Sequence, residues 1–270
     1  MFNILGRGFF TFTQRLAMAN ISAVIITKNE ERNIARCIES LKTIADEVLI
    51  VDSGSTDKTI EIAENLDAKV IRTEWQGYSA TKNYGNEQAA FNYILSIDAD
   101  EMVSDQLTKS IVAVKLNLTT GTSFSFNRLT NYCGSWIKHC GWYPDTKMRL
   151  WNREDGKWEG DIHEQIVFKN SVHIEKLKGD LFHYSYYTKT DHYAQADKFT
   201  TLTAKDAYLK GKRSNFIKML TSPLAKFVKA YFIQLGFLDG AAGFQVCRIS
   251  AYAAFQKYSK LKKLQQGDEI

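Results

Sequence analysis

Short apolar runs alternate with segments of helical periodicity through the first hundred residues, and this alternation restricts the possible folds most strongly. The apolar runs are short and rich in β-branched residues, as expected for strands buried on both faces. The expected strands are 21–27, 47–51, 69–72 and 93–97. The expected helices between them are 31–41, 58–66 and 78–89. This order predicts an α/β fold with a mainly parallel sheet and helices on both faces.

The rest of the chain divides into two parts with different patterns. Residues from about 121 to 183 are rich in aromatic residues, glycine and short extended runs, which predict further strands and loops that complete the sheet and line a cleft. Residues 191–270 have a helical pattern. We therefore expect an N-terminal extension at 1–20, an α/β domain at 21–190 with halves 21–100 and 101–190, and a helical C-terminal region.

The N-terminal segment and the cysteines suggest a protein of a reducing compartment. Residues 1–19 are apolar and lightly basic but lack a clean signal-peptide core and cleavage site, and Met18 offers an internal start. We expect them to form a disordered or surface-lying extension. Cys133 and Cys140 flank His139, but their spacing is unusual for zinc, so ordinary reduced cysteines in a cytosolic protein are the better interpretation.

Basic charge is concentrated at the C-terminal end of the chain. Residues 205–270 contain twelve Lys or Arg against four Asp or Glu, whereas the rest is slightly acidic. Such a region can bind an anionic surface, either phospholipid or nucleic acid. Ser222-Pro223 predicts a helix start, followed by one apolar face. The expected face consists of Leu224, Phe227, Val228, Tyr231 and Leu235. We expect it either to lie on a membrane surface or to pack on the α/β domain.

Polar residues follow three of the expected strands. Thr27 ends the first, with Asn29 and Glu30 after it; Asp52 follows the second, and Asp98-Ala99-Asp100 follows the fourth. Ligands of open parallel sheets bind at the carboxyl ends of the strands. Asp52 alone could simply cap the next helix, but three such groups at one edge indicate a site. Carboxylates two residues apart can bind a divalent cation, which in turn can bind a diphosphate.

Several runs of the sequence resemble family-2 glycosyltransferases with the GT-A fold. They are VIITKNEERNIARCIESL, DEVLIVDSGSTDKTIEIA, the set Trp75, Gly77, Lys82 and Asn83, and LSIDADE. Further runs look like those of bacterial lipopolysaccharide core-biosynthesis glucosyltransferases of that family. These are CGSWIKHCGWYPDTKMRLW, GDIHEQIV, LFHYSYY, GKRSNF and YFIQLGFLDG. The resemblance runs from Ser22 to Leu264. It implies that 21–100 binds the nucleotide and that 101–190 faces the acceptor.

The resemblance also implies roles for individual residues. Thr27, Asn29, Glu30 and Asp52 would hold the nucleoside of a nucleotide-sugar. Lys82 and Asn83 would reach the nucleotide or its phosphates, although Lys82 could also be a solvated helix residue. Asp98 would lie near the ribose and the metal, and Asp100 would coordinate the metal, either Mn2+ or Mg2+. His183 could complete the metal shell through a ring nitrogen, or could be a hydrogen-bonded core residue.

An inverting transfer needs a carboxylate base opposite the leaving diphosphate. Glu164 is the first candidate because the pair His163-Glu164 matches the motif of the family, and Asp161 is its rival. An exposed carboxylate pair on a hairpin is the alternative. Arg149 could approach the diphosphate or could serve in a structural ion pair.

Together with the strand-end carboxylates, the resemblance implies an inverting, metal-dependent enzyme that moves glucose from UDP-glucose to a lipopolysaccharide-core or related envelope acceptor. The alternatives are transfer to a polyprenyl phosphate or to a protein side chain, and a non-catalytic membrane-surface binding protein. Because no nucleic-acid motif accompanies the basic region, we expect no nucleic-acid partner. No apolar run is long enough to predict a transmembrane helix. The expected location is the cytoplasm, peripherally on the inner face of the cytoplasmic membrane, where a lipid-anchored glycan acceptor would lie.

Overall fold

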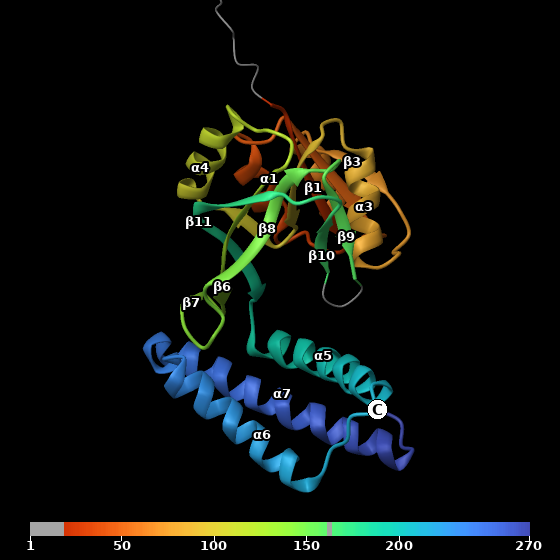
Figure 1. Ribbon diagram of the computed structural model, residues 1–270, viewed down its shortest axis with the longest axis vertical. Coiled ribbons are helices and arrows are strands. Elements are labelled where there is room, and N and C mark those ends of the chain that lie inside the picture. Colours follow the sequence, from red (N-terminus) through yellow and green to blue (C-terminus); the bar gives the residue numbers. More distant parts are fainter. Residues whose placement is uncertain (1–18, 161–163) are drawn as a thin grey trace, which may run out of the picture.

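The computed structural model describes residues 19–160 and 164–270 of the chain. Of the expected N-terminal extension, only the last two residues fall within this range. Figure 1 shows an α/β part and, below it, a group of long helices. The first elements are β1 (Ile21–Thr27), α1 (Ile34–Leu41), β2 (Glu47–Asp52), α2 (Thr59–Asn65), β3 (Lys69–Arg72), α3 (Tyr78–Gln88) and β4 (Tyr93–Asp98). The expected alternation of strand and helix is confirmed.

The second stretch of the α/β part contains mostly strands. Its elements are β5 (Glu101–Val103), α4 (Asp105–Lys115), β6 (Thr122–Tyr132), β7 (Ser135–Ile137), β8 (Asp145–Asn152), β9 (Gly156–Glu159), β10 (Gln165–Phe168) and β11 (His173–Tyr186). Within the described ranges, one sheet has the order β3-β2-β1-β4-β8-β6-β11-β5, with β7 paired to β6, and β9 and β10 form a separate hairpin. The sheet is parallel from β3 to β4 and mixed beyond β4.

The register of the parallel strands brings the polar strand ends together. Thr27 of β1 lies beside Asp52 of β2, and Ile26 lies beside Asp98 of β4. Three of the residues predicted to form a site are therefore adjacent at the carboxyl edge of the sheet, where an open parallel sheet binds ligands.

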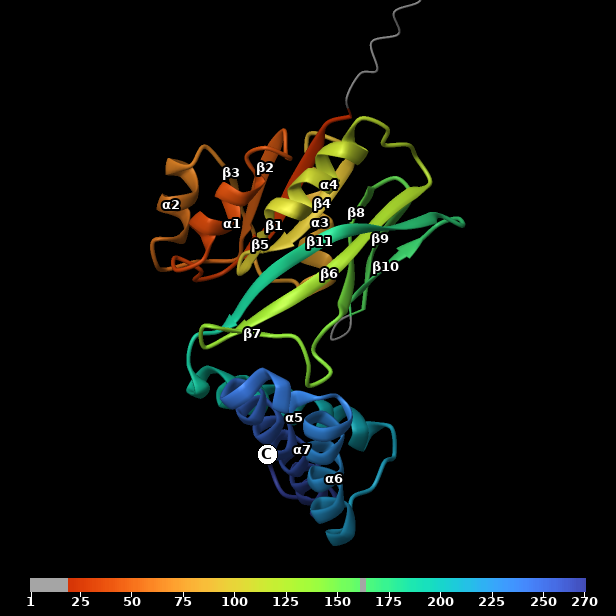
Figure 2. The same cartoon turned by 90° about the vertical axis from the view of Figure 1, so that its left-hand side faces the viewer.

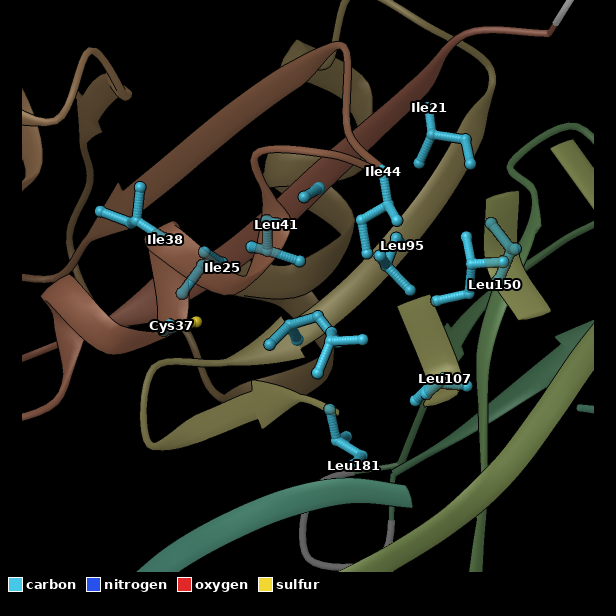
Figure 3. Close-up of a cluster of buried hydrophobic side chains, with 14 of the residues drawn as sticks. Ile21, Ile25, Cys37, Ile38, Leu41, Ile44, Leu95, Leu107, Leu150 and Leu181 are labelled. Atoms are coloured by element: carbon cyan, nitrogen blue, oxygen red, sulfur yellow. The ribbon is translucent and has the colours of Figure 1, made fainter. Parts of the chain in front are cut away.

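Alternate residues of the strands are buried against different layers. Ile21, Ala23 and Ile25 of β1 belong to the larger core, which α1, α2 and α4 cover. Figure 3 shows part of that core, with residues of α1 packed on β1 and β4. Val24 faces the other way, toward a second core that includes Trp151 and Trp158. Because side chains alternate across a strand, an apolar residue at every position requires cover on both faces.

Helix α3 lies very close to the sheet on this second face. A Cβ added at Gly85 would stand 2.7 Å from both Val24 Cγ1 and Val51 Cγ2. Only a residue without a side chain fits at this position, and the close approach fixes the height of α3 above β1 and β2.

The helical part consists of α5 (Lys189–Leu209), α6 (Phe216–Val228), the π-helical η1 (Lys229–Ile233), the 3-10 helix η2 (Gly236–Asp239) and α7 (Gly240–Gln266). Figure 2 shows α6 and α5 beside α7, below the ends of β6 and β7. An apolar cluster joins the two parts: Tyr132 of β6 and Ile137 of β7 pack with Ala230, Val246 and Cys247. Within the described ranges, no helix is both long enough and apolar enough to span a bilayer.

The predicted start of a helix at Ser222-Pro223 is wrong. Helix α6 begins at Phe216, because the side chain of Asn215 accepts a hydrogen bond from the Lys218 N–H and caps it, and Pro223 lies inside the helix. The expected single apolar face is wrong as well. Phe227 and Tyr231 pack inward, whereas Leu224, Val228 and Leu235 are exposed. The π-helical turns of η1 change the residue spacing, so the sequence pattern cannot be extended past Val228.

Candidate active site

The loops after β1 and β2 are joined by hydrogen bonds. The Asn29 N–H donates to Ser55 Oγ at 2.9 Å, and the Asn29 side-chain oxygen accepts from the Thr56 N–H at 2.8 Å. The Glu30 N–H donates to Thr59 Oγ1 at 2.7 Å. Asn29 has a φ of 57°, which asparagine tolerates better than most residues. The two loops therefore form one rigid rim at the carboxyl edge of β1 and β2.

Asp52 is buried beneath this rim and holds a turn. Its carboxylate accepts from the Gly54 N–H at 2.9 Å and the Ser55 N–H at 3.0 Å, and also from the Ser55 hydroxyl. Asp52 therefore holds a turn within the loop and does not cap helix α2, which begins at Thr59, where the Thr59 N–H donates to Asp57. Thr27 lies next to Asp52, and its hydroxyl is buried without a hydrogen-bond partner within the described residues.

Asp98 lies between two buried cations. Its Oδ2 is 2.7 Å from an Arg149 guanidinium nitrogen and its Oδ1 is 3.2 Å from Lys82 Nζ. Burial alone would raise the pKa of Asp98, but the Arg149 guanidinium and the Lys82 ammonium hold it well below its usual range. Asp98 is therefore a carboxylate whose two oxygens are both engaged by the protein.

Glu101 completes the charge network from below and was missed by the sequence reasoning. Its side chain has no exposed surface, lies 2.9 Å from Arg149 and 3.4 Å from Arg128, and accepts from the Asp98 N–H at 2.9 Å. The available signal was a glutamate at the start of a buried strand, since an ionised side chain is rarely buried without a partner. Arg128, the second missed residue, continues the network to Asp145 at 2.8 Å.

Asp100 is paired with His183 rather than with the cations. Asp100 Oδ2 lies 3.2 Å from His183 Nε2, and the imidazole also contacts the Ser185 hydroxyl at 2.7 Å. The pKa of Glu30 depends on this pair. Burial and, to a lesser extent, the negative charge of Asp100 raise it, whereas the charge of His183 lowers it. His183 is thus hydrogen-bonded within the chain and also lies against Asp100, so its predicted role as a metal ligand stays a prediction.

This pair determines how a divalent cation could be held. Within the described residues, no group of three or more His, Cys, Asp or Glu side chains is arranged around one point as a metal site. The carboxylate of Asp100 and the imidazole of His183 are nevertheless a donor set that suits Mn2+, and Mg2+ often takes one or two carboxylates plus substrate phosphates. The residues present thus fit a cation that needs a diphosphate to complete its shell.

Lys82 connects Asp98 with the predicted base. The buried Lys82 Nζ lies 3.3 Å from Glu164 Oε1 and 4.6 Å from the centre of the Trp158 ring. These side chains, with Arg149 and others, line a cavity of about 530 Å³. This volume is in the range of small-molecule sites. The other predicted base, Asp161, lies outside the described residues.

Asn83 makes structural contacts instead of facing the cavity with free groups. Its amide nitrogen donates to the Trp158 carbonyl and its oxygen accepts from the Trp158 N–H, both at 2.9 Å. Asn83 thereby holds β9 against α3 and keeps the Trp158 ring next to Lys82. Trp158 was not predicted as a site residue.

A comparison with protein-family models decides the class of the molecule. The model described as glycosyl transferase family 2 matches residues 22–175. The chain belongs to this family. Every described residue of the site lies within the matched range except His183, and the mixed sheet with its flanking helices is the architecture expected from the GT-A resemblance.

Relatives of this glycosyltransferase match it over nearly the whole length. An uncharacterized glycosyltransferase of Rickettsia typhi is 35% identical over 258 residues, covering 92% of this chain and 88% of that protein. The lipopolysaccharide core biosynthesis glycosyltransferase LpsC of Rhizobium meliloti is 29% identical over 253 residues, covering 89% and 91%.

Solved structures match the transferase more loosely. The alignment with the structure of TarS residues 1–349 from S. aureus covers 93% of this chain and 93% of that chain, with a TM-score of 0.46 and 14% identity. Glucosyl-3-phosphoglycerate synthase from Mycobacterium tuberculosis, solved with Mn2+ and UDP-glucose, covers 42% of this chain and 44% of its own with a TM-score of 0.35 and 22% identity.

Proposed function

We propose that the chain is an inverting, metal-dependent hexosyltransferase that moves glucose from UDP-glucose to a lipopolysaccharide-core or related cell-envelope acceptor. One observation carries this proposal: Lys82 contacts both Asp98 and Glu164 in a single cavity, at the strand edge where Asp100 pairs with His183. A site that combines groups able to hold a cation with a further carboxylate suits the displacement of a nucleoside diphosphate.

The rim formed by the β1 and β2 loops is the proposed nucleoside site. The hydroxyl of Thr27 is buried without an internal partner, and such a group is usually satisfied by a ligand or water. Asn29 and Glu30 stand at the same rim. Asp52 contributes by fixing the turn at Gly54 and Ser55 that carries the backbone of the rim.

Asp100 and His183 are the proposed ligands of Mn2+ or Mg2+. A bound divalent cation would offset the charge that develops on the departing diphosphate. Lys82 and Arg149 orient Asp98 beside this position, and Asp98 is expected to approach the ribose. Glu101 holds Arg149 from below.

Glu164 is the proposed base. It accepts the proton of the acceptor hydroxyl as that oxygen attacks the anomeric carbon, and its contact with Lys82 fixes the carboxylate at the cavity wall. If Glu164 does not take this role, Asp161 is the next candidate.

The proposed acceptor is a lipid-anchored glycan. The support comes from the relative named for lipopolysaccharide core biosynthesis, which matches nearly the whole chain, and from the basic helical region. Transfer to a polyprenyl phosphate or a protein side chain is the alternative. A non-catalytic role is less favoured because Asp98, Asp100 and Glu164 are all present. The proposed location is the inner face of the cytoplasmic membrane, peripherally bound.

A hydrolysis screen tests the donor and the metal together. The protein is incubated with a panel of UDP-, GDP- and dTDP-sugars, with Mn2+, with Mg2+ or with chelator, and the release of nucleoside diphosphate is measured. We expect release from UDP-glucose only in the presence of metal. Equal turnover in chelator would overturn the metal-dependent mechanism.

Variants assign the roles. Asp100→Ala and His183→Ala should each lower metal-dependent turnover by at least a hundredfold, because each removes a proposed ligand. His173→Ala is the matched control, since His173 lies exposed on the same strand. Glu164→Gln should bind UDP-glucose normally and fail in transfer. Normal transfer by Glu164→Gln would exclude it as the base.

A further inference from the structure

The outer face of α6 carries large apolar side chains that are about half exposed to solvent. Ile217, Leu220, Leu224 and Val228 are between 40% and 67% exposed, and no residue of α6 is buried. Their spacing of three, four and four residues puts them on one side of the helix. Figure 2 shows α6 at the outside of the helical part, away from the sheet.

The apolar surface continues beyond the end of α6. Phe232 and Ile233 of η1 and Phe237 and Leu238 of η2 are each between 45% and 73% exposed. Together with the four side chains of α6 they form what we call the outer apolar face. Eight partly exposed side chains of this size present on the order of several hundred Å², the size at which an exposed patch indicates an interaction site.

Poor packing of the helix on its neighbours does not explain the outer apolar face. The inward side of the same segment is well packed: Phe227 and Tyr231 stack at 5.3 Å, and both make edge contacts with Phe244 of α7. The segment thus has a satisfied inner side and a separate apolar outer side, so a second partner is needed only outside.

The charge around this face indicates what the partner is. Residues 207–238 contain six Lys or Arg and no Asp or Glu. Lys218 lies about 100° around the helix from Ile217, and Lys229 directly follows Val228, so both are close to the apolar face. A partner must therefore combine apolar surface with negative charge.

We propose that the outer apolar face docks on an anionic phospholipid bilayer, with its side chains at the boundary of headgroups and acyl chains and the lysines on lipid phosphates. A bilayer supplies both the apolar layer and the negative charge. A second copy of this chain does not, because a symmetric contact through the same face would bring two basic borders together. The proposal deepens the proposed function: it rests on that function only for the lipid-anchored acceptor and assigns the surface that brings the site to it.

Co-sedimentation with vesicles tests the proposal. The probes are vesicles of phosphatidylcholine alone and of equal parts phosphatidylcholine and phosphatidylglycerol. We expect the full chain to bind the anionic vesicles and to bind the neutral ones much more weakly. Leu220→Asp/Leu224→Asp should weaken binding at least tenfold, and Lys218→Gln/Lys229→Gln about thirtyfold. Leu116→Asp is the control, because Leu116 is 45% exposed at the end of α4 in the α/β part.

Each outcome supports or overturns the proposal. Failure of the wild-type chain to bind anionic vesicles, or loss of binding in the Leu116 control to the same degree, overturns it. A concentration-dependent dimer that Leu220→Asp/Leu224→Asp dissociates would assign the face to a second copy instead. Metal-dependent release of UDP needs no membrane, so it is measured on the same variants. Vesicle binding without UDP release would contradict the proposed function but not this inference. UDP release without vesicle binding would contradict this inference but not the proposed function.

Discussion

Replacement of the buried Glu101 by glutamine tests the charge network beneath the site. Glu101→Gln keeps the shape of the side chain and removes its charge. The carboxylate faces donors on every side that the structure describes, namely two guanidinium groups and the N–H of Asp98. A glutamine amide group would turn a donor toward one of these donors and leave Arg149 with a single carboxylate partner.

The magnitude follows from the burial of the pair. The side chains of Glu101 and Arg149 are 0% and 4% exposed, so solvent screens their interaction little. Removing one partner of such a pair costs about 3–5 kcal/mol. Because Asp98 still contacts Arg149 at 2.7 Å, we expect the lower end, about 3 kcal/mol. In thermal unfolding this corresponds to a decrease in Tm of roughly 6–12 °C.

The assay is urea unfolding followed by circular dichroism, with Asp145→Asn as the matched control. Asp145 is at the other end of the same network but is 31% exposed, and its partner Arg128 is 21% exposed. Its loss should cost about 0–1 kcal/mol after screening by solvent. If Glu101→Gln destabilises the protein no more than Asp145→Asn, the account of a buried network is wrong.

Three further predictions concern other parts of the molecule. Lys82→Met removes the cation between Asp98 and Glu164 and should lower kcat/KM for UDP-glucose at least a hundredfold in steady-state assays, and wild-type values would contradict its role. Gly85→Ala forces a Cβ to within 2.7 Å of two valine side chains and should cost about 1–3 kcal/mol in urea unfolding, whereas an unchanged midpoint would refute the close packing. Burial in α5 lowers the pKa of His192 to about 4 from 6.5. Between these pH values the unfolded chain binds a proton at His192 that the folded chain does not bind, so the free energy of unfolding should decrease as the pH drops from 6.5 to 4. His192→Phe should flatten that part of the profile, and an identical pH profile would exclude His192 as its cause.

The parallel half of the sheet could be predicted from the sequence because its signals are local. Each strand of this half is a short apolar run, and the residue after each run is at the carboxyl edge by the geometry of parallel sheets. Thr27, Asp52 and Asp98 were found in this way. The order of β8, β6 and β11 depends on pairing between distant segments, which no local period encodes.

The partners of the predicted residues were harder to predict for the same reason. Asp98 has the sequence signature of a metal ligand. In the fold, however, Arg149 of β8 and Lys82 of α3 each contact one oxygen of its carboxylate. Asn83 carries a family motif, yet its contacts with Trp158 depend on the position of the β9–β10 hairpin. Sequence patterns identified residues of the site, whereas the tertiary structure decided which charges face each other.

The charge balance of the site gives a physical reason to expect metal dependence. Lys82 and Arg149 are the buried cations next to Asp98, and both are already paired with carboxylates of the chain. A diphosphate that entered this cavity would bring further negative charge toward cations that are already neutralised, and in a partly buried site that repulsion is weakly screened. Asp100 and His183 pair with each other rather than with those cations, and as the proposed ligands they would share a divalent cation with the diphosphate. On this argument a nucleoside diphosphate binds tightly only together with a metal ion, which is why undiminished turnover in chelator would contradict the electrostatics of the site as well as the proposed mechanism.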